Sequence, residues 1–401
     1  MKYNRLRNLS LLVFGVVTGV VISCSSAEDP DPMSERGRDL WRDLAPYFEP
    51  PDTFAGEFGD YPDLFEFEDG SRVESASDWE MRREEIRSEW HRMMGVWPEL
   101  LNDPEVEVLE RDELEGMELL RIRFSWTPYE ETEGYLLIPE GEEPRPAVIV
   151  GYYEPETAIG RGQSPQRDFA RQLARRGFVT LSLGTTEGTE NQTYTIYHPD
   201  INNAQIEPLS MLAYAAVTGW HLLANRPEVD STRIGITGHS YGGKWAMFAS
   251  TLFDGFAAAA WSDPGIVFDE SVLNNNYWEP WYLGYHPKPW RDRGPITEEN
   301  PVHGLYPVLR EQGHDLTELH ALMAPRPFLV SGGSADTPDR WVALNHTIAV
   351  NRLLGYEGRV GMSNRPDHSP NEASNRILVD FFDYFLMEKG IQRTHPPDVN
   401  P

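Results

Sequence analysis

The fold of this 401-residue chain is decided by one stretch, Arg233-Ile234-Gly235-Ile236-Thr237-Gly238-His239-Ser240-Tyr241-Gly242-Gly243. Its first five residues predict a short strand, and the residues from Gly243 onward predict a helix. A serine on a sharp strand-to-helix turn leaves no room for side chains two positions away, so glycine is needed at Gly238 and Gly242. Such a turn lifts the Ser240 hydroxyl above the edge of the sheet as a nucleophile. The alternative is that Ser240 only caps the helix.

The rest of the chain predicts an α/β fold. Residues 105–150 hold four short apolar stretches separated by charged or Gly/Pro turns, and the first three are expected to form antiparallel strands. After Val150, predicted strands and helices alternate up to a final helix over residues 373–387. This alternation predicts a mainly parallel central sheet with helices on both faces.

Taken together, these features resemble the α/β-hydrolase superfamily over residues 105–390. Besides the serine turn, the approach Asn225-Arg226-Pro227-Glu228-Val229-Asp230 is similar to that of bacterial esterases of this fold, as is the later entry Leu322-Met323-Ala324-Pro325-Arg326-Pro327-Phe328. In this superfamily the nucleophile, the acid and the histidine follow one another along the chain. The resemblance therefore implies that Ser240 works with a later carboxylate and a still later histidine.

His368 is the best-placed base among the 11 histidines. It lies in the loop 365–370, after the last predicted strand and directly before the last helix. His239 belongs to the serine turn itself, His346 lies within a predicted helix, and His395 lies in the tail. We therefore expect His368 to take the proton of Ser240.

Two carboxylates could orient this histidine. Asp336 follows the strand before the strand of the histidine, the usual position in the superfamily, and is favoured. Asp263 follows the strand after the serine helix, which is where glucuronoyl esterases often carry their acid. Either carboxylate could instead cap the next turn.

The oxyanion hole needs two backbone N–H groups that point to the developing negative charge. One is expected from Tyr241, the residue after the nucleophile. The second should come from the loop after residues 147–150, and Tyr152 is the predicted donor.

Residues 277–293 are rich in aromatic side chains mixed with polar and cationic groups, a composition that suits stacking on sugar rings. The predicted sugar contacts are Trp278, Trp281 and Tyr285. The alternative is that these rings pack a lid segment onto the core.

This segment, together with Asp263 and Lys244, is similar to glucuronoyl esterases and related bacterial carbohydrate esterases such as acetyl xylan esterases. The resemblance implies that Lys244 contacts sugar hydroxyl groups, whereas the alternative is a lysine on the helix surface. Glucuronoyl esterases usually have Cys before and Arg after the serine. This chain has His239 and Tyr241 there, a departure that bears on uronate-ester specificity.

Acidic residues outnumber basic ones by 64 to 35, which gives a net charge of −29. A surface of this charge repels phosphate backbones, so we expect no nucleic-acid partner. It also repels polyanionic polymers, so the expected substrate is an uncharged sugar ester. Local cations could still hold one carboxylate near the site, namely Lys244, Lys288, Arg291 and Arg293.

The single cysteine, Cys24, excludes an intrachain disulfide and a cysteine-rich metal site. Before it come a basic start and an apolar run, Leu11–Ile22, too short to span a membrane. Ser23-Cys24 resembles the lipobox of bacterial lipoproteins, which implies that Cys24 is lipidated and anchors the protein in the cell envelope. The alternative is an ordinary export signal.

These patterns predict five regions. They are a lipoprotein signal peptide (1–23), an acidic tether (24–38), an N-terminal helical segment packed on the core (39–104), the catalytic domain (105–390) and a flexible tail (391–401). Within the helical segment, Ser77-Asp78-Trp79-Glu80 has the spacing of a capping box.

The predicted function is that of a serine carboxylic-ester hydrolase without metal or organic cofactor, acting on polysaccharide esters, acetyl or glucuronoyl. The triad does not distinguish an ester from an amide, so a serine peptidase of the same fold is an alternative. A catalytically inactive glycan-binding module is another. The sequence does not predict an oligomeric state.

Overall fold

The computed structural model describes residues 33–162, 164–185 and 195–389. From Ser34 onward, the described residues form one compact unit. The predicted signal peptide, Cys24 and the tail 391–401 lie outside the described residues.

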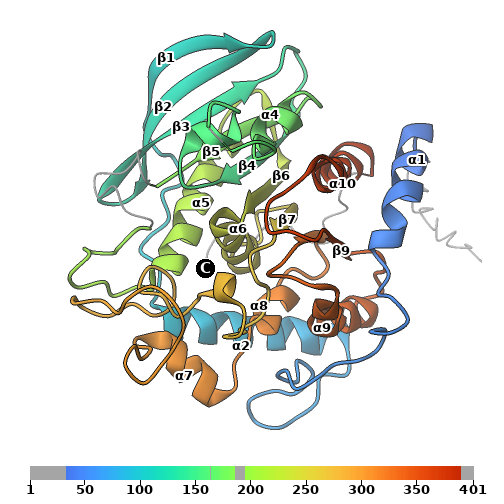
Figure 1. Ribbon diagram of the computed structural model, residues 1–401. Coiled ribbons are helices and arrows are strands. Elements are labelled where there is room, and N and C mark those ends of the chain that lie inside the picture. The colour runs from blue at the N-terminus through green and yellow to red at the C-terminus, as the bar shows by residue number, and fades with distance from the viewer. Residues whose placement is uncertain (1–32, 163, 186–194, 390–401) are drawn as a thin grey trace, which may run out of the picture. The chain divides into compact units, whose positions relative to one another are not determined.

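One mixed sheet of nine strands organises this unit, in the order β1-β2-β3-β5-β4-β6-β7-β8-β9 (Figure 1). The strands β1 to β3 pair antiparallel, β3 also pairs antiparallel with β5, and all further pairs are parallel. This confirms the predicted antiparallel start and mainly parallel sheet. The strands are β1 (Val106–Leu114), β2 (Met117–Thr127), β3 (Glu130–Ile138), β4 (Arg145–Gly151), β5 (Val179–Leu183), β6 (Val229–His239), β7 (Ala258–Ser262), β8 (Phe328–Gly332) and β9 (Val360–Asn364).

Helices cover the sheet on both sides. In the part of the chain that the structure describes they are α1 (Glu35–Leu44), α2 (Ala76–Met94), α3 (Pro155–Ala158), α4 (Phe169–Ala174), α5 (Pro208–Ala224), α6 (Tyr241–Leu252), α7 (Leu305–Gln312), α8 (Thr317–Ala321), α9 (Trp341–Leu353) and α10 (Glu372–Phe382). One face carries α4 and α10, which contact each other, and the other carries α5, α6 and α9. The chain continues from α10 into a π-helical turn, Asp383–Glu388.

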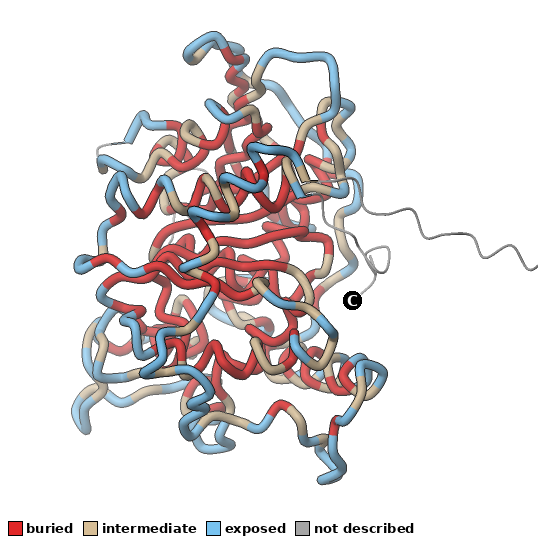
Figure 2. The backbone as a smooth tube through the Cα atoms, turned by 90° about the vertical axis from the view of Figure 1, so that its right-hand side faces the viewer, coloured by how far each residue is buried: buried red, intermediate tan, exposed pale blue. Residues whose placement is uncertain are grey.

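The strands β5, β7 and β8 are buried along their whole length, because helices cover both of their faces. Figure 2 shows the buried backbone in red through the middle of the molecule. The sequences of β7 and β8 are accordingly mostly apolar without alternation, and even the polar residues of β5, Thr180 and Ser182, are buried. By contrast, β1 lies at the edge of the sheet, and its charged residues are mostly exposed. The parallel strands β4, β6, β7 and β8 are neighbours, so the residues that follow them meet at one edge of the sheet.

Two predicted boundaries differ from the structure. The last four residues of the predicted tether already belong to α1, which Ser34 caps by accepting from the Gly37 N–H. The capping box of α2 is formed by Ser75 and Asp78 rather than by Ser77 and Glu80. A helix can begin at either serine by spacing alone, and Ser75 is the one with extended backbone.

The helix α2 is fixed to the catalytic body by a cluster of charges around Asp254. Its Arg83 and Arg87 both bind this carboxylate, Arg87 Nη2 at 2.6 Å, and Arg326 approaches it at 3.0 Å. All four side chains are less than one-fifth exposed. Despite its burial, the pKa of Asp254 is held well below its usual range by Arg83, Arg326 and Arg87.

Replacement of Asp254 by Asn is expected to lower the free energy of unfolding by about 3 kcal/mol, because three largely buried guanidinium groups lose the carboxylate they share, and the other partner of Arg83 and Arg87, Glu84, is 61% exposed. Since the pKa of Asp254 is lowered in the folded state, its contribution is present above pH ~4 and is lost on acidification. Urea unfolding of both proteins at pH 7 and pH 3 measures the difference. Asp339→Asn, which removes an exposed partner of Arg340, is the control with little expected effect. An equal effect of the two substitutions would contradict the assignment.

No helix in the described ranges is both long and apolar enough to cross a bilayer.

Candidate active site

The turn between β6 and α6 has the geometry that the glycines predict. Ser240 has φ 56° and ψ −109°, a left-handed conformation that non-glycine residues rarely adopt. A Cβ atom on Gly242 would overlap the carbonyl oxygen of Gly151 at the end of β4, and one on Gly238 would lie 2.7 Å from the same oxygen. Both positions therefore require glycine, and the Ser240 N–H donates to Ser262 O at 2.8 Å.

His368 lies against this serine. Its Nε2 is 2.8 Å from Ser240 Oγ, and its Nδ1 is 2.6 Å from Oδ2 of Asp263. The imidazole is 26% exposed, whereas the carboxylate is fully buried. With Nδ1 protonated, the ring donates to Asp263 and leaves Nε2 to accept the proton of Ser240.

The carboxylate that contacts His368 is thus Asp263, not the favoured Asp336. Asp336 accepts instead from the N–H groups of Gly265 at 2.9 Å and Ile266 at 2.6 Å. Burial, together with the nearby charge of Asp263, raises the pKa of Asp336. Both aspartates follow neighbouring parallel strands, so both lie at the same edge of the sheet. For this reason the sequence alone does not decide which of them contacts the histidine.

The two aspartates hold each other's loops. Asp263 Oδ1 accepts from the N–H groups of Gly333, Ala335 and Asp336, at 2.6, 3.1 and 2.9 Å. Asp336 binds the N–H groups of the loop that carries Asp263. Asp263 itself has φ 52°, so its backbone is held in a conformation that needs such support.

The predicted oxyanion donors have different outcomes. Tyr241 is the first residue of α6, so the helix itself provides no acceptor for its N–H. Tyr152 also lies beside the serine turn, but its N–H donates to Leu183 O at 3.0 Å. Tyr152 therefore does not supply the second donor, because the β4–β5 pairing continues one residue further than the sequence predicts.

Lys244 does not face outward. It is 2% exposed, and its Nζ donates to the backbone oxygens of Pro264 and Asn274, the latter at 2.9 Å. The ammonium group lies 4.4 Å from the ring centre of Tyr277, and burial lowers the pKa of Lys244 to about 7. Lys244 thus supports the loop after β7 from beneath, and its expected contact with sugar hydroxyl groups stays a prediction.

The aromatic segment divides into a buried and a half-buried set. Trp278 is fully buried, and its indole N–H donates to Gly294 O at 3.0 Å, so it packs the segment rather than offering a surface. Trp281 and Tyr285 are only partly buried. The Tyr285 hydroxyl binds backbone groups of Ile201 and Ala204, and its ring approaches Tyr197 at 5.9 Å.

Arg365 is a candidate positioning residue that the sequence does not reveal. Its guanidinium is buried and donates to His368 O at 2.7 Å, Ser331 O at 2.7 Å and Ser369 O at 2.9 Å. It thereby fastens the loop of His368 to the end of β8. The only signal in the sequence is its position three residues before the histidine.

Replacement of Arg365 by Lys is expected to lower kcat about 100-fold, because the loop of His368 loses most of its donors and a displacement of about 1 Å is enough for such a loss. KM is expected to change much less. Steady-state kinetics of the variant, with its thermal unfolding curve, measure this positioning role. Arg359→Lys, at a partly buried arginine over Tyr356, is the matched control. A variant that folds and keeps its kcat would contradict the role.

Among the residues that the structure describes, no group of three His, Cys, Asp or Glu side chains is arranged to hold a metal ion.

Two family models match the sequence. Residues 215–358 match the prolyl oligopeptidase family, and residues 132–274 match the dienelactone hydrolase family. No curated protein matches the chain.

Several solved structures share the fold. A glucuronoyl esterase from Solibacter usitatus superposes with a TM-score of 0.62 at 16% identity, over 81% of this chain and 97% of that chain. A glucuronoyl esterase of carbohydrate esterase family 15 from Teredinibacter turnerae gives 0.57 at 16% identity, over 87% and 99% of the two chains. A putative acetyl xylan esterase from Bacteroides fragilis gives 0.52 at 15% identity, over 80% and 86%.

The sheet order, the serine turn, the two hydrolase family models and these neighbours agree with one another. The chain is an α/β-hydrolase-fold protein, similar to known hydrolases that include carbohydrate esterases.

Proposed function

We propose that this protein is a serine carboxylic-ester hydrolase that acts on esters of polysaccharides. The observation that carries the proposal is the unbroken contact chain from Ser240 Oγ through His368 to Asp263, with distances of 2.8 and 2.6 Å. A strained turn holds the serine, N–H groups of the loop after β8 hold the Asp263 carboxylate, and the Arg365 guanidinium holds the loop of His368.

In the proposed reaction Ser240 attacks the acyl carbon while His368 Nε2 takes its proton. Negative charge develops on the carbonyl oxygen, where the N–H of Tyr241 stabilises it. His368 then gives its proton to the leaving alcohol, and the acyl group stays on Ser240. Water, activated by the same imidazole, releases the acid, while Asp263 stabilises the imidazolium throughout.

The glycan part of the proposal is supported by the aromatic segment 277–293 and by the esterases among the structural neighbours. Trp281 and Tyr285 are the half-buried rings of the predicted contacts. Tyr197 and Trp290 extend them, stacked with their ring centres 5.9 Å apart. Acetyl and uronoyl esters are the proposed acyl chemistries.

A panel of acetylated glycans, feruloyl esters and alkyl glucuronates, assayed with the purified protein, tests the substrate class. Hydrolysis of one glycan ester class at a kcat/KM well above that of a simple aryl ester supports the proposal. An aryl ester hydrolysed faster than every glycan ester would refute its carbohydrate part.

A serine peptidase is the second candidate, because the match to the prolyl oligopeptidase family covers the serine turn and Asp263. The triad would attack an amide by the same steps. Faster hydrolysis of short peptide amides than of aryl esters would decide for this candidate.

We also propose that Cys24 carries a lipid that holds the protein in a bacterial cell envelope. The basic start, the apolar run and Ser23 before the cysteine support this proposal. Cys24→Ser is expected to move the protein from the membrane fraction to the soluble fraction on cell fractionation. Retention of the variant in the membrane fraction would exclude the anchor.

A further inference from the structure

The cations predicted to hold one carboxylate are mostly engaged elsewhere. The ammonium of Lys244 is bound by backbone oxygens, and Arg291 forms a buried ion pair with Glu279 at 3.0 Å. Lys288 lies 5.0 Å from the ring centre of Trp290, at the outer end of the aromatic segment. None of these contacts brings a free cation to Ser240.

Arg167, which the sequence does not single out, lies beside the reacting groups. Its Nη1 donates to the hydroxyl of Tyr152, and its guanidinium carbon lies 5.5 Å from the centre of that ring. Its Nη2 is 3.4 Å from Oγ of Ser369, the residue after His368. Tyr152 directly follows Gly151, whose carbonyl oxygen packs on the serine turn. Arg167 thus bridges the two loops that flank Ser240.

The backbone before Arg167 is held in place from α10. Asn375, which is buried, donates to the carbonyl oxygen of Gln166 at 2.8 Å. Gln166 has φ 64°, a left-handed conformation that costs free energy for a residue other than glycine. The side chain of Arg167 is therefore presented by a fixed turn rather than by a loose loop.

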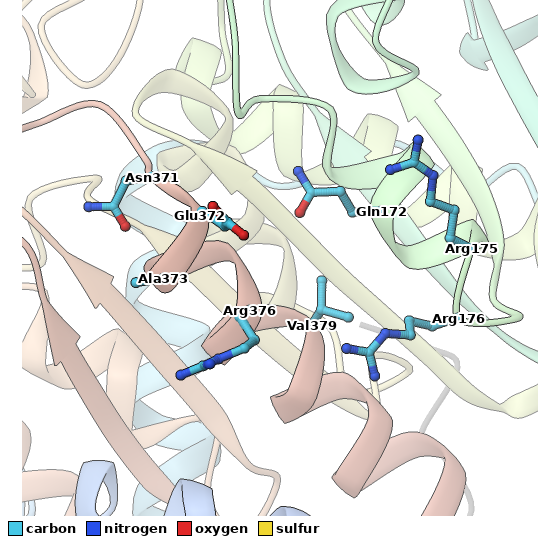
Figure 3. Close-up of a pocket in the computed structure, with 8 residues that line it drawn as sticks. All are labelled: Gln172, Arg175, Arg176, Asn371, Glu372, Ala373, Arg376 and Val379. Atoms are coloured by element: carbon cyan, nitrogen blue, oxygen red, sulfur yellow. The ribbon is translucent and has the colours of Figure 1, made fainter.

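The charge of Arg167 has no carboxylate partner in the described part of the chain, where both of its partners are neutral hydroxyl groups. By contrast, the two arginines directly after α4 have carboxylate partners. Arg175 binds Glu115 with two contacts of 2.7 Å, and Arg176 binds Asp380 and Asp383. Figure 3 shows these two arginines at the side of a pocket between α4 and α10. Arg167 is thus an arginine near the triad whose charge no carboxylate of the described residues neutralises, in a sequence with 64 acidic residues.

We propose that Arg167 forms a subsite for one carboxylate of the substrate, next to the ester that Ser240 attacks. The proposal rests on the ester-hydrolase function and specifies its substrate class: an ester on a molecule that carries a free carboxylate close by, such as a glycan containing a uronic acid. A guanidinium offers two parallel N–H groups to a carboxylate, and the partly buried setting strengthens the pair. The overall charge of −29 disfavours polymers with many negative charges, so the subsite is expected to bind one carboxylate of a substrate that carries few such charges.

The experiment compares aryl acetates that differ only in one charge. The anionic substrates are 3- and 4-acetoxybenzoate, and their neutral counterparts are 3- and 4-acetoxybenzamide. In the wild-type protein, kcat/KM for the better benzoate is expected to exceed that of its amide. In Arg167→Met this ratio is expected to fall about 10- to 100-fold, mainly through KM, because a charged hydrogen-bonded pair is lost. Arg167→Lys should restore part of the ratio, since it keeps the charge.

Arg175→Met is the matched control, because it removes a cation of the neighbouring helix that is already paired with Glu115. It is expected to leave the ratio unchanged. If Arg167→Met lowers kcat/KM for both substrates equally, or if Arg175→Met changes the ratio as strongly, the subsite is refuted.

Binding separates this inference from the proposed function. Calorimetric titration of the Ser240→Ala variant with glucuronate, and with glucose as the neutral comparison, requires no turnover. Glucuronate binding that disappears in the Ser240→Ala/Arg167→Met double variant supports the subsite even if the wild type hydrolyses no ester. Ester hydrolysis without any preference for the anionic substrate, together with no glucuronate binding, overturns the subsite and leaves the esterase proposal intact.

Discussion

Ser240→Ala and His368→Ala are each expected to lower kcat for ester hydrolysis by about 10⁶-fold, the largest effects predicted for this protein. The reason is that nucleophile and base act as a unit: without either, no acyl-enzyme forms and only the weak rate of the remaining site survives. Steady-state assays with an aryl ester measure both variants.

Ser271→Ala, at an exposed serine with only local contacts to Asp269, is the control and should retain full activity. Circular dichroism and thermal unfolding show whether the variants fold. A Ser240→Ala protein that folds and keeps more than about one-hundredth of the rate would remove Ser240 from the reaction. If the wild-type protein hydrolyses no ester, and the wild type and Ser240→Ala bind glycans equally well, the glycan-binding module is favoured.

Asp263→Asn is expected to lower kcat by up to about 10⁴-fold, whereas Asp336→Asn should lower it far less. The asparagine at position 263 keeps the shape but loses the charge that stabilises the imidazolium, and its amide group favours the wrong tautomer of His368. At position 336 the substitution disturbs the N–H groups of Gly265 and Ile266 without touching the imidazole.

The pair of variants is its own control, because both remove one buried carboxylate from the same edge of the sheet. The comparison uses kcat at saturating substrate and the thermal unfolding of each variant. The reverse ranking would make Asp336 the acid and would show that the contact between Asp263 and His368 is not the productive one.

The sequence predicts the fold well because its strongest signals are local. The strand, the glycines and the helix around Ser240 lie within a few residues of one another. The steric need for glycine on either side of the serine can be stated without knowledge of the rest of the chain. The position of His368 follows from chain order, since the last strand and the last helix delimit its loop. These two residues meet in the structure at 2.8 Å.

The parts that the sequence does not predict depend on distant contacts. Asp263 and Asp336 follow neighbouring strands, and which of them reaches His368 is decided by loop conformations, such as φ 52° at Asp263. Lys244 lies four residues after the nucleophile, but only the folded loop after β7 shows that carbonyl oxygens surround its ammonium group. Arg365 contacts Ser331 O on β8, and Arg167 contacts the hydroxyl groups of Tyr152 and Ser369; a sequence carries no pattern for such contacts between loops.

The mutual anchoring of Asp263 and Asp336 has a consequence for how this active site can change over time. A substitution at either position leaves buried N–H groups of the opposite loop without an acceptor, at a cost of about 1–3 kcal/mol for each unsatisfied group. The acid therefore cannot migrate from the end of β7 to the end of β8 in one mutational step without loss of stability. Paired changes would be less harmful than the sum of the single ones, because residues in one network are not additive. Any evolutionary or engineered route between the two acid positions must pass through both loops together.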